Sequence, residues 1–161
     1  MRAGSTGSEN MNIGDIRTTR VIVTHPDQPL AEAARLMCEE QVGSLVVLDP
    51  KDPQRRPVGM LTDRDIVRGQ VFKAADLYCL TVGDVMSTHP LCLGIEMNLA
   101  DGIDAMNARA VRRAPVTDRN GTLVGIVTLD DLLPAVASEL HELAKLMKSQ
   151  TRRDAARGGA T

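Results

Sequence analysis

The segment VGMLTDRD at residues 58–65 returns as VGIVTLDD at residues 124–131, 66 positions later. Further upstream, IGDI at residues 13–16 is matched by VGDV at residues 82–85, 69 positions later. The difference of three residues falls in residues 50–57, a charged, proline-rich stretch that predicts a longer loop in the first copy. A unit of this length that occurs only twice is not a solenoid repeat. We therefore expect two copies of one small α/β module, packed face to face with a pseudo-symmetric cleft between them.

The composition limits the classes of function. The chain has 161 residues, about one domain's worth, and aromatic residues make up only 1% of it. Proteins that bind single-stranded nucleic acid stack bases on aromatic side chains, and binding phosphates takes clustered Lys and Arg. This chain has a formal net charge of −2. The composition therefore argues against a general nucleic-acid-binding surface.

The sequence also indicates a compartment. No run approaches the ~18 apolar residues of a membrane-spanning helix, and residues 1–11 are polar, without the apolar core of a signal peptide. Cys38, Cys79 and Cys92 are odd in number and lie in apolar or helical contexts, which is typical of buried, reduced thiols. We expect a cytoplasmic protein with a disordered leader.

Both copies predict the same order of elements: strand, helix, strand, strand, helix. In the first copy these are residues 20–23, 30–40, 44–48, 58–61 and a helix from 62 to about 69. In the second copy they are residues 90–93, 99–108, 114–117, 123–127 and a helix from 128, with a hairpin turn at Asn120-Gly121. The run 44–48 is apolar throughout, as in a strand that is buried on both faces.

The predicted organisation is a leader (1–11), a first repeat (12–69), a connector (70–80), a second repeat (81–140) and a C-terminal helix with a basic tail (141–161). In the connector, Phe72, Leu77 and Tyr78 indicate that this segment packs against the body. The apolar positions within residues 140–147 predict an amphipathic helix, which packs either on the module or on a second subunit. Residues 149–161 predict a frayed end.

Thr62-x-x-Asp65 and Thr128-x-x-Asp131 each stand where a strand turns into a helix. One interpretation is a capping box, in which the Thr oxygen accepts a hydrogen bond from a free N–H of the first turn. The other is a ligand site, because a helix N-terminus favours phosphate and an acidic residue can accept from a ribose diol. The motif recurs in register, each time after a glycine, Gly59 or Gly125, that lets another group approach the backbone closely. This recurrence favours the ligand site.

This set of motifs resembles the cystathionine β-synthase (CBS) domain, and two in tandem resemble a CBS pair, or Bateman module. The resemblance rests on the order of elements, on Val-Gly-h-h-Thr-x-x-Asp (h, hydrophobic) at the last junction and on Leu-x-x-Ala-x-x-x-Met in the first helix, and it spans about residues 13–140. It implies an α/β (α+β) fold of two β-α-β-β-α repeats around a pseudo-twofold axis. It also implies an adenosine-containing ligand: AMP first, with NAD, ADP or ATP as alternatives, and magnesium only as the nucleotide's own. A disc-shaped homodimer is implied as well.

The resemblance further implies two clefts between the repeats. Asp65 and Asp131 would hold the ribose hydroxyls, with Thr62 and Thr128 near the ribose or the phosphate. Adenine would take backbone hydrogen bonds from the first strand of a repeat, at Val21, Ile22 and Val23 or at residues 91–93. The second strand of one repeat would reach the ligand on the other repeat's Asp. These residues are Arg112, Arg113, Ala114 and Pro115 for the Asp65 cleft and Gly43, Ser44 and Leu45 for the Asp131 cleft.

The two implied clefts differ in charge. Arg112 and Arg113 bring two guanidinium groups to the Asp65 cleft, whereas Gly43 and Ser44 bring none to the Asp131 cleft, where Arg64 is the expected cation. Paired surface arginines are as often a solvated edge, but their planar forks match phosphate oxygens. We expect the Asp65 cleft to bind a phosphorylated ligand better.

The leading hypothesis is therefore a non-catalytic regulatory sensor whose ligand changes the packing of repeats or subunits, read by an unidentified partner protein. The alternative is an interaction or dimerisation module, acting through its C-terminal helix, with little or no ligand binding. The sequence contains no Ser/His/Asp or Cys/His arrangement and no Walker-type loop, so catalysis is not expected. His25, His89 and His141 share no metal-ligand spacing with each other or with the cysteines.

Overall fold

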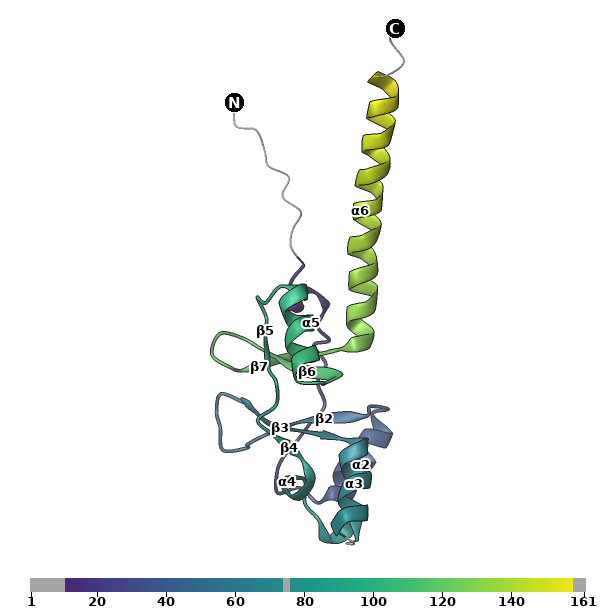
Figure 1. The fold of residues 1–161 in the computed structure, drawn as a ribbon. Helices are drawn as coiled ribbons and strands as arrows, with labels where there is room; N and C mark the ends of the chain where they lie inside the picture. The colour runs from purple at the N-terminus through teal and green to yellow at the C-terminus, as the bar shows by residue number, and fades with distance from the viewer. Residues whose placement is uncertain (1–10, 74–75, 158–161) are drawn as a thin grey trace.

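Two small sheets stacked on each other form the body, and one long helix projects from it (Figure 1). The computed structural model describes residues 11–73 and 76–157. In chain order the elements are α1 (Ile13–Ile16), β1 (Val23–Thr24), α2 (Leu30–Glu39), β2 (Ser44–Leu48), β3 (Pro57–Thr62), α3 (Asp63–Lys73), the 3-10 helix η1 (Leu77–Cys79), α4 (Val82–Val85), β4 (Ser87–Thr88), β5 (Leu93–Gly94), α5 (Leu99–Ala108), β6 (Arg113–Thr117), β7 (Leu123–Thr128) and α6 (Leu129–Arg157).

The two sheets repeat one topology. The first has the order β1-β2-β3-β4 and the second β5-β6-β7. In each, the first strand runs parallel to the second and the second antiparallel to the third. The predicted strand-helix-strand-strand-helix order and the α/β fold class are confirmed. Helices α2 and α3 cover the outer face of the first sheet and α5 that of the second.

Strand β2 shows why its sequence is apolar throughout. Leu45 and Val47 pack in a core under α2, whereas Val46 and Leu48 pack on the other face, towards the second sheet. All five residues of the strand are buried. Because alternate side chains point to opposite faces, a continuous apolar run serves two cores at once.

Each unit is completed by the entry segment of the other repeat. Ile13 of α1 is fully buried in the core of the second unit, and its N–H donates to the Met97 carbonyl at 2.8 Å. In the same way Val82 of α4 is buried in the core of the first unit, where its N–H donates to the Gln28 carbonyl at 2.9 Å. The two units therefore depend on each other for their cores.

The glycines of the repeated motif make room for these crossing segments. A Cβ on Gly59 would lie 3.0 Å from the Ser87 carbonyl oxygen, and one on Gly125 would lie 3.0 Å from the Thr18 carbonyl oxygen. Ser87 pairs with β3, and Thr18 forms an isolated bridge to β7. The groups that approach each glycine therefore belong to the crossing segments of the chain itself, Met86 and Ser87 at Gly59 and Arg17 and Thr18 at Gly125.

We expect Gly59→Ala to lower the free energy of unfolding by about 1–3 kcal/mol, the usual cost of overpacking. The new methyl group meets a backbone oxygen that is fixed by strand pairing and cannot rotate away. Gly94→Ala is the matched control, because a Cβ on Gly94 would have nothing within 4 Å. Urea unfolding of both variants decides the point, and equal midpoints would contradict this role for Gly59.

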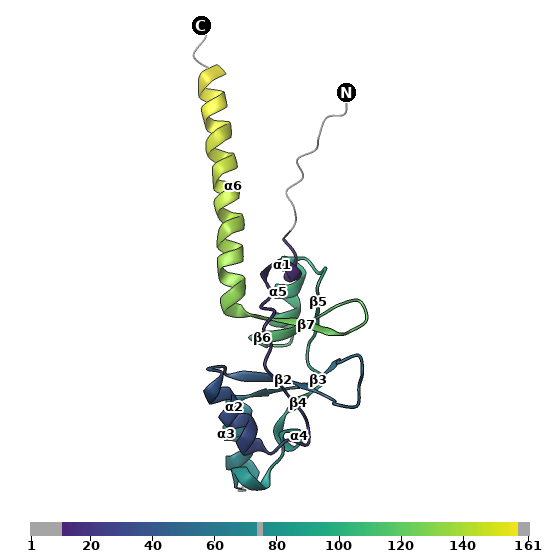
Figure 2. The same ribbon diagram turned by 180° about the vertical axis from the view of Figure 1, so that it is seen from behind.

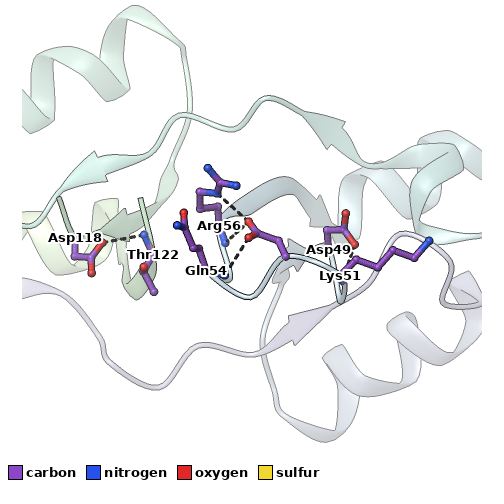
Figure 3. Close-up of polar contacts among 7 residues, drawn as sticks. Asp49, Lys51, Gln54, Arg56, Asp118 and Thr122 are labelled. Carbon is purple, nitrogen blue, oxygen red and sulfur yellow. Dashed lines mark hydrogen bonds and ion pairs between the residues drawn. The ribbon is translucent and has the colours of Figure 1, made fainter. Parts of the chain in front are cut away.

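The two loops that differ between the repeats meet in space. The Leu123 N–H donates to the Arg55 carbonyl at 3.2 Å. A turn is present at the predicted hairpin, but its central residues are Arg119 and Asn120, because the Gly121 N–H donates to the Asp118 carbonyl at 3.0 Å, and Gly121 has φ +81°. The Asp118 carboxylate accepts the Thr122 N–H at 2.9 Å (Figure 3). In the longer loop of the first repeat, the Asp52 carboxylate accepts from Arg56 Nε at 2.8 Å. This bond lowers the pKa of Asp52.

Several expectations need correction. Phe72 and Tyr78 are 78% and 81% exposed, so within the connector it is Leu77 that packs on the core. Cys38 and Cys79 are exposed rather than buried. The frayed end predicted from residue 149 is helical as far as Arg157. The leader up to residue 10 and the tail from residue 158 lie outside the described residues. Among the helices that the structure describes, none is long and apolar enough to cross a membrane.

Candidate functional site

The Thr62-x-x-Asp65 motif forms a closed hydrogen-bond set at the junction of β3 and α3. Asp65 Oδ2 accepts from the Thr62 N–H at 2.9 Å and from Thr62 Oγ1 at 2.7 Å. The Asp65 N–H donates back to Thr62 Oγ1 at 3.2 Å. The motif is therefore a reciprocal cap, and the capping interpretation of the sequence is correct as far as it goes.

The second motif has the same geometry. Asp131 Oδ2 accepts from the Thr128 N–H at 2.8 Å and from Thr128 Oγ1 at 2.7 Å, and the Asp131 N–H lies 3.4 Å from Thr128 Oγ1. In both motifs the cap uses only Oδ2. Within residues 11–73 and 76–157, nothing donates to the Oδ1 atom of Asp65 or Asp131. Capping and ligand binding are therefore compatible, because one carboxylate oxygen caps the helix while the other is available.

A cavity of about 550 Å³ opens at Asp65. Its walls come from the start of α3, from the β4–β5 segment at residues 87–91 and from the α5–β6 loop at residues 109–113. This volume lies within the usual range of small-molecule sites. The first repeat therefore supplies the capped carboxylate, and the second repeat supplies the opposite wall.

Four arginines surround this cavity: Arg64, Arg109, Arg112 and Arg113. In the described part of the chain, none of their guanidinium groups forms an ion pair or a hydrogen bond with another side chain. Two carboxylates, Asp63 and Asp65, also line the cavity. The excess of cationic groups without partners suits an anionic ligand.

Two arginines of the cavity wall were not expected there. Arg64, which the resemblance assigns to the Asp131 cleft, lines the Asp65 cavity. It lies between the two cavity carboxylates in α3, on the same helix turn as Asp65. Arg109 was missed, although a signal was available: its counterpart 69 positions earlier is Glu40. Comparing the two copies position by position would have found this reversal of charge at the end of the first helix.

The other predicted residues divide between wall and core. Arg112 is exposed and Arg113 is half-buried. Ala114, Pro115 and Leu45 are fully buried and do not line the cavity. Gly43 lies beside two side chains of the Asp65 cavity wall, because a Cβ on it would be 3.2 Å from the Arg113 guanidinium and 3.4 Å from Asp63 Oδ2. The side chains of Val21 and Val23 pack in the core between the sheets, and that of Ile22 packs in the core under α2. Ser44 is buried at the start of β2.

The predicted adenine strand of the second repeat begins at the cavity. Leu91 lines the cavity wall, and the next residue, Cys92, is half-buried. Burial raises the pKa of the Cys92 thiol, which keeps it protonated at neutral pH. Within the described residues, no group of three or more His, Cys, Asp or Glu side chains could hold a metal ion.

Comparison with known proteins agrees with this architecture. The family model described as the CBS domain matches residues 13–71 and again residues 82–138. The chain belongs to the CBS domain family. CBS domain-containing protein YhcV of Bacillus subtilis is 38% identical over 121 residues, which cover 75% of this chain and 82% of that protein.

Other CBS-domain relatives cover similar shares of this chain. An uncharacterized 17.7 kDa protein of Acidianus ambivalens is 36% identical over 124 residues, 77% of this chain and 72% of that protein. The crystal structure of CBSX2 in complex with AMP superposes with a TM-score of 0.67 at 29% identity, covering 79% of this chain and 96% of that one. CBS pairs that stand without an attached enzyme are therefore well represented among its relatives.

Proposed function

We propose that this CBS pair is a non-catalytic regulatory module that binds an adenosine nucleotide, AMP first, in the Asp65 cavity. The observation that carries the proposal is a set of four arginines around a capped carboxylate, whose guanidinium groups have no side-chain partner among the residues that the structure describes. An AMP complex in a relative that is 29% identical supports the class of ligand. NAD, ADP and ATP are the alternatives, and magnesium enters only as the counterion of a nucleotide's phosphates.

The carboxylate of Asp65 would recognise the ribose. Within residues 11–73 and 76–157 its Oδ1 atom accepts no hydrogen bond, while its Oδ2 atom is fixed by Thr62 and the residue lines the cavity. A ribose hydroxyl is a donor that such an oxygen accepts. The cap therefore orients the binding group in advance, which lowers the entropy cost of binding.

The arginines would hold the phosphate, and the aliphatic wall would hold the base. Guanidinium groups bind phosphate oxygens bidentately, and Arg113 is the half-buried member of the set. Met60, Leu91 and Val111 supply apolar surface to the same cavity. Adenine, which is flat and weakly polar, suits such a wall better than open solvent.

The walls suggest how binding would be transmitted. Because the cavity is built from α3 of the first repeat and from the β4–β5 and α5–β6 segments, a ligand contacts both repeats at once. A ligand that prefers one packing of the repeats shifts the population towards it. We propose that this shift, in a homodimer, is what a separate regulated protein detects. The Asp131 cleft, to which the resemblance assigns Gly43 and Ser44, would bind phosphate more weakly.

The arginines give the proposal a direct test. We expect Arg112→Gln with Arg113→Gln to weaken AMP binding by about tenfold to a hundredfold, since hydrogen bonds to charged groups contribute about 1.5–3 kcal/mol. Adenosine, which has no phosphate, should lose less than about threefold. Calorimetric titration of both ligands into the full chain measures the difference.

The matched control is Arg119→Gln. Arg119 is exposed on the hairpin turn and pairs with Glu96 at 2.6 Å, away from the cavity, so AMP affinity should stay the same. If AMP and adenosine lost affinity equally in the double variant, the arginines would not be reading the phosphate. If the wild-type chain bound neither ligand, the proposed function itself would fail.

A further inference from the structure

Helix α6 extends far beyond the body that it helps to complete. Leu132 and Ala135 are buried in the core of the second unit, so the first turns of the helix belong to the fold. The rest of the 29-residue helix stands clear of both sheets in opposite views (Figures 1 and 2). At about 1.5 Å per residue the whole helix is about 43 Å long.

Apolar residues mark one face of this helix. Leu133, Leu140 and Met147 follow each other at intervals of seven residues and are 61%, 62% and 70% exposed. The sequence fills the intermediate positions with Leu129, Val136 and Leu143, which completes a 4-3-4-3-4 spacing. We call these six residues the α6 stripe. This spacing is the a/d seam of a coiled coil, in which a second helix covers the apolar positions.

The charges along α6 indicate which helix would cover the α6 stripe. Residues 129–143 contain four carboxylates and no Lys or Arg, a net charge of −4. Residues 144–157 contain five Lys or Arg and one Asp, a net charge of +4. The helix dipole favours this polarity only in the first and last turns, yet Glu139, Glu142, Lys145 and Lys148 lie in the middle of the helix. The dipole therefore does not account for the whole pattern.

We propose that α6 forms an antiparallel two-stranded coiled coil with α6 of a second copy of this chain. In that arrangement, centred near Leu143, the acidic half of each helix lies along the basic half of its partner, and the stripe residues Leu140, Leu143 and Met147 are buried between the two helices. A parallel pair would place acidic on acidic and basic on basic. Charge complementarity therefore selects both the occupant and its direction. The interface is separate from the nucleotide cavity and does not depend on its ligand.

Sedimentation velocity of the full chain tests the interface with two variants. Leu140→Glu puts a carboxylate into the stripe, and we expect it to raise the dissociation constant of self-association at least about tenfold. Ser138→Glu adds the same charge two residues away, on the opposite face of α6, and should change the constant less than about twofold. Both positions lie beyond the buried first turns, so thermal unfolding of the body should remain as in the wild type. A monomeric wild type, or self-association unchanged by Leu140→Glu, would overturn the proposal.

Salt tests the direction of the helices. Raising NaCl from about 0.05 to about 0.5 M shortens the Debye length from above 10 Å to below 5 Å. An antiparallel pair loses attraction, so its dissociation constant should rise. A parallel pair loses repulsion, so its constant would fall, and that result would overturn the antiparallel arrangement.

Discussion

Asp65→Asn is expected to weaken AMP binding by about a hundredfold while the protein stays folded. The substitution keeps a side-chain oxygen that can still accept the cap bonds from Thr62, which Asp65 Oδ2 now accepts at 2.7 and 2.9 Å. It replaces the other oxygen with an NH₂ group, which donates and cannot accept from a ribose hydroxyl. Losing charged hydrogen bonds of about 1.5–3 kcal/mol each accounts for the size of the effect.

Asp131→Asn is the control for this variant. It makes the same chemical change in a cap of the same geometry, but Asp131 does not line the described cavity. We expect the stronger AMP site to keep its affinity within about threefold. Calorimetry on both variants decides between the two clefts, and a loss confined to Asp131→Asn would move the site to the second repeat.

Ile13→Ala is expected to lower the free energy of unfolding by about 2–5 kcal/mol, the usual cost of removing a large buried aliphatic side chain. Ile13 has no exposed surface and lies in the core of the second unit. A Cβ built on Gly102 of α5 would come as close as 3.0 Å to Ile13 Cγ1 and closer still to its Cδ1, so the two residues pack directly together. Urea unfolding measures the change.

The part of the protein that Ile13→Ala destabilises is as informative as the loss in free energy of unfolding. Although Ile13 lies at the start of the first repeat in sequence, hydrogen exchange in Ile13→Ala should accelerate in α5 and β5–β7, which share its core. Val71→Ala, at a position 69% exposed on α3, should cost less than about 0.5 kcal/mol. Hydrogen exchange that accelerates first in α2 and β1–β3 would contradict the placement of Ile13 in the core of the second unit.

The order of elements could be predicted from the sequence because each signal is local and occurs twice. The apolar run of β2 and the spacing of Leu30, Ala33 and Met37 in α2 each specify an element without knowledge of the rest of the chain. Repetition then excluded coincidence. The ends of β2, β3, β6 and β7 lie within one residue of the prediction. Strands β1 (Val23–Thr24) and β5 (Leu93–Gly94) begin three residues later than expected, because pairing with β2 and β6 sets their length and not their own side chains.

The assembly of the cavity was less accessible to the sequence. Apolar residues such as Ile13 and Val82 show that they will be buried but not in which unit, since that depends on how the chain crosses between the sheets. The same crossing brings residues 87–91 to Asp65. That Arg64 lines the Asp65 cavity was not expected, because its place relative to Thr62 fixes the helix turn but not the cavity that this turn faces. Arg109 needed a comparison of the two copies.

A thermal-shift panel with AMP, ADP, ATP, NAD, NADH, S-adenosylmethionine and GMP tests the central claim most directly. A ligand that binds only the folded state raises the melting temperature as its concentration exceeds its Kd. We predict a rise that depends on concentration with AMP or another adenosine nucleotide, and none with GMP at the same concentration. Equal shifts with GMP, or no shift with any adenosine ligand, would contradict the claim that this CBS pair is an adenosine-nucleotide sensor.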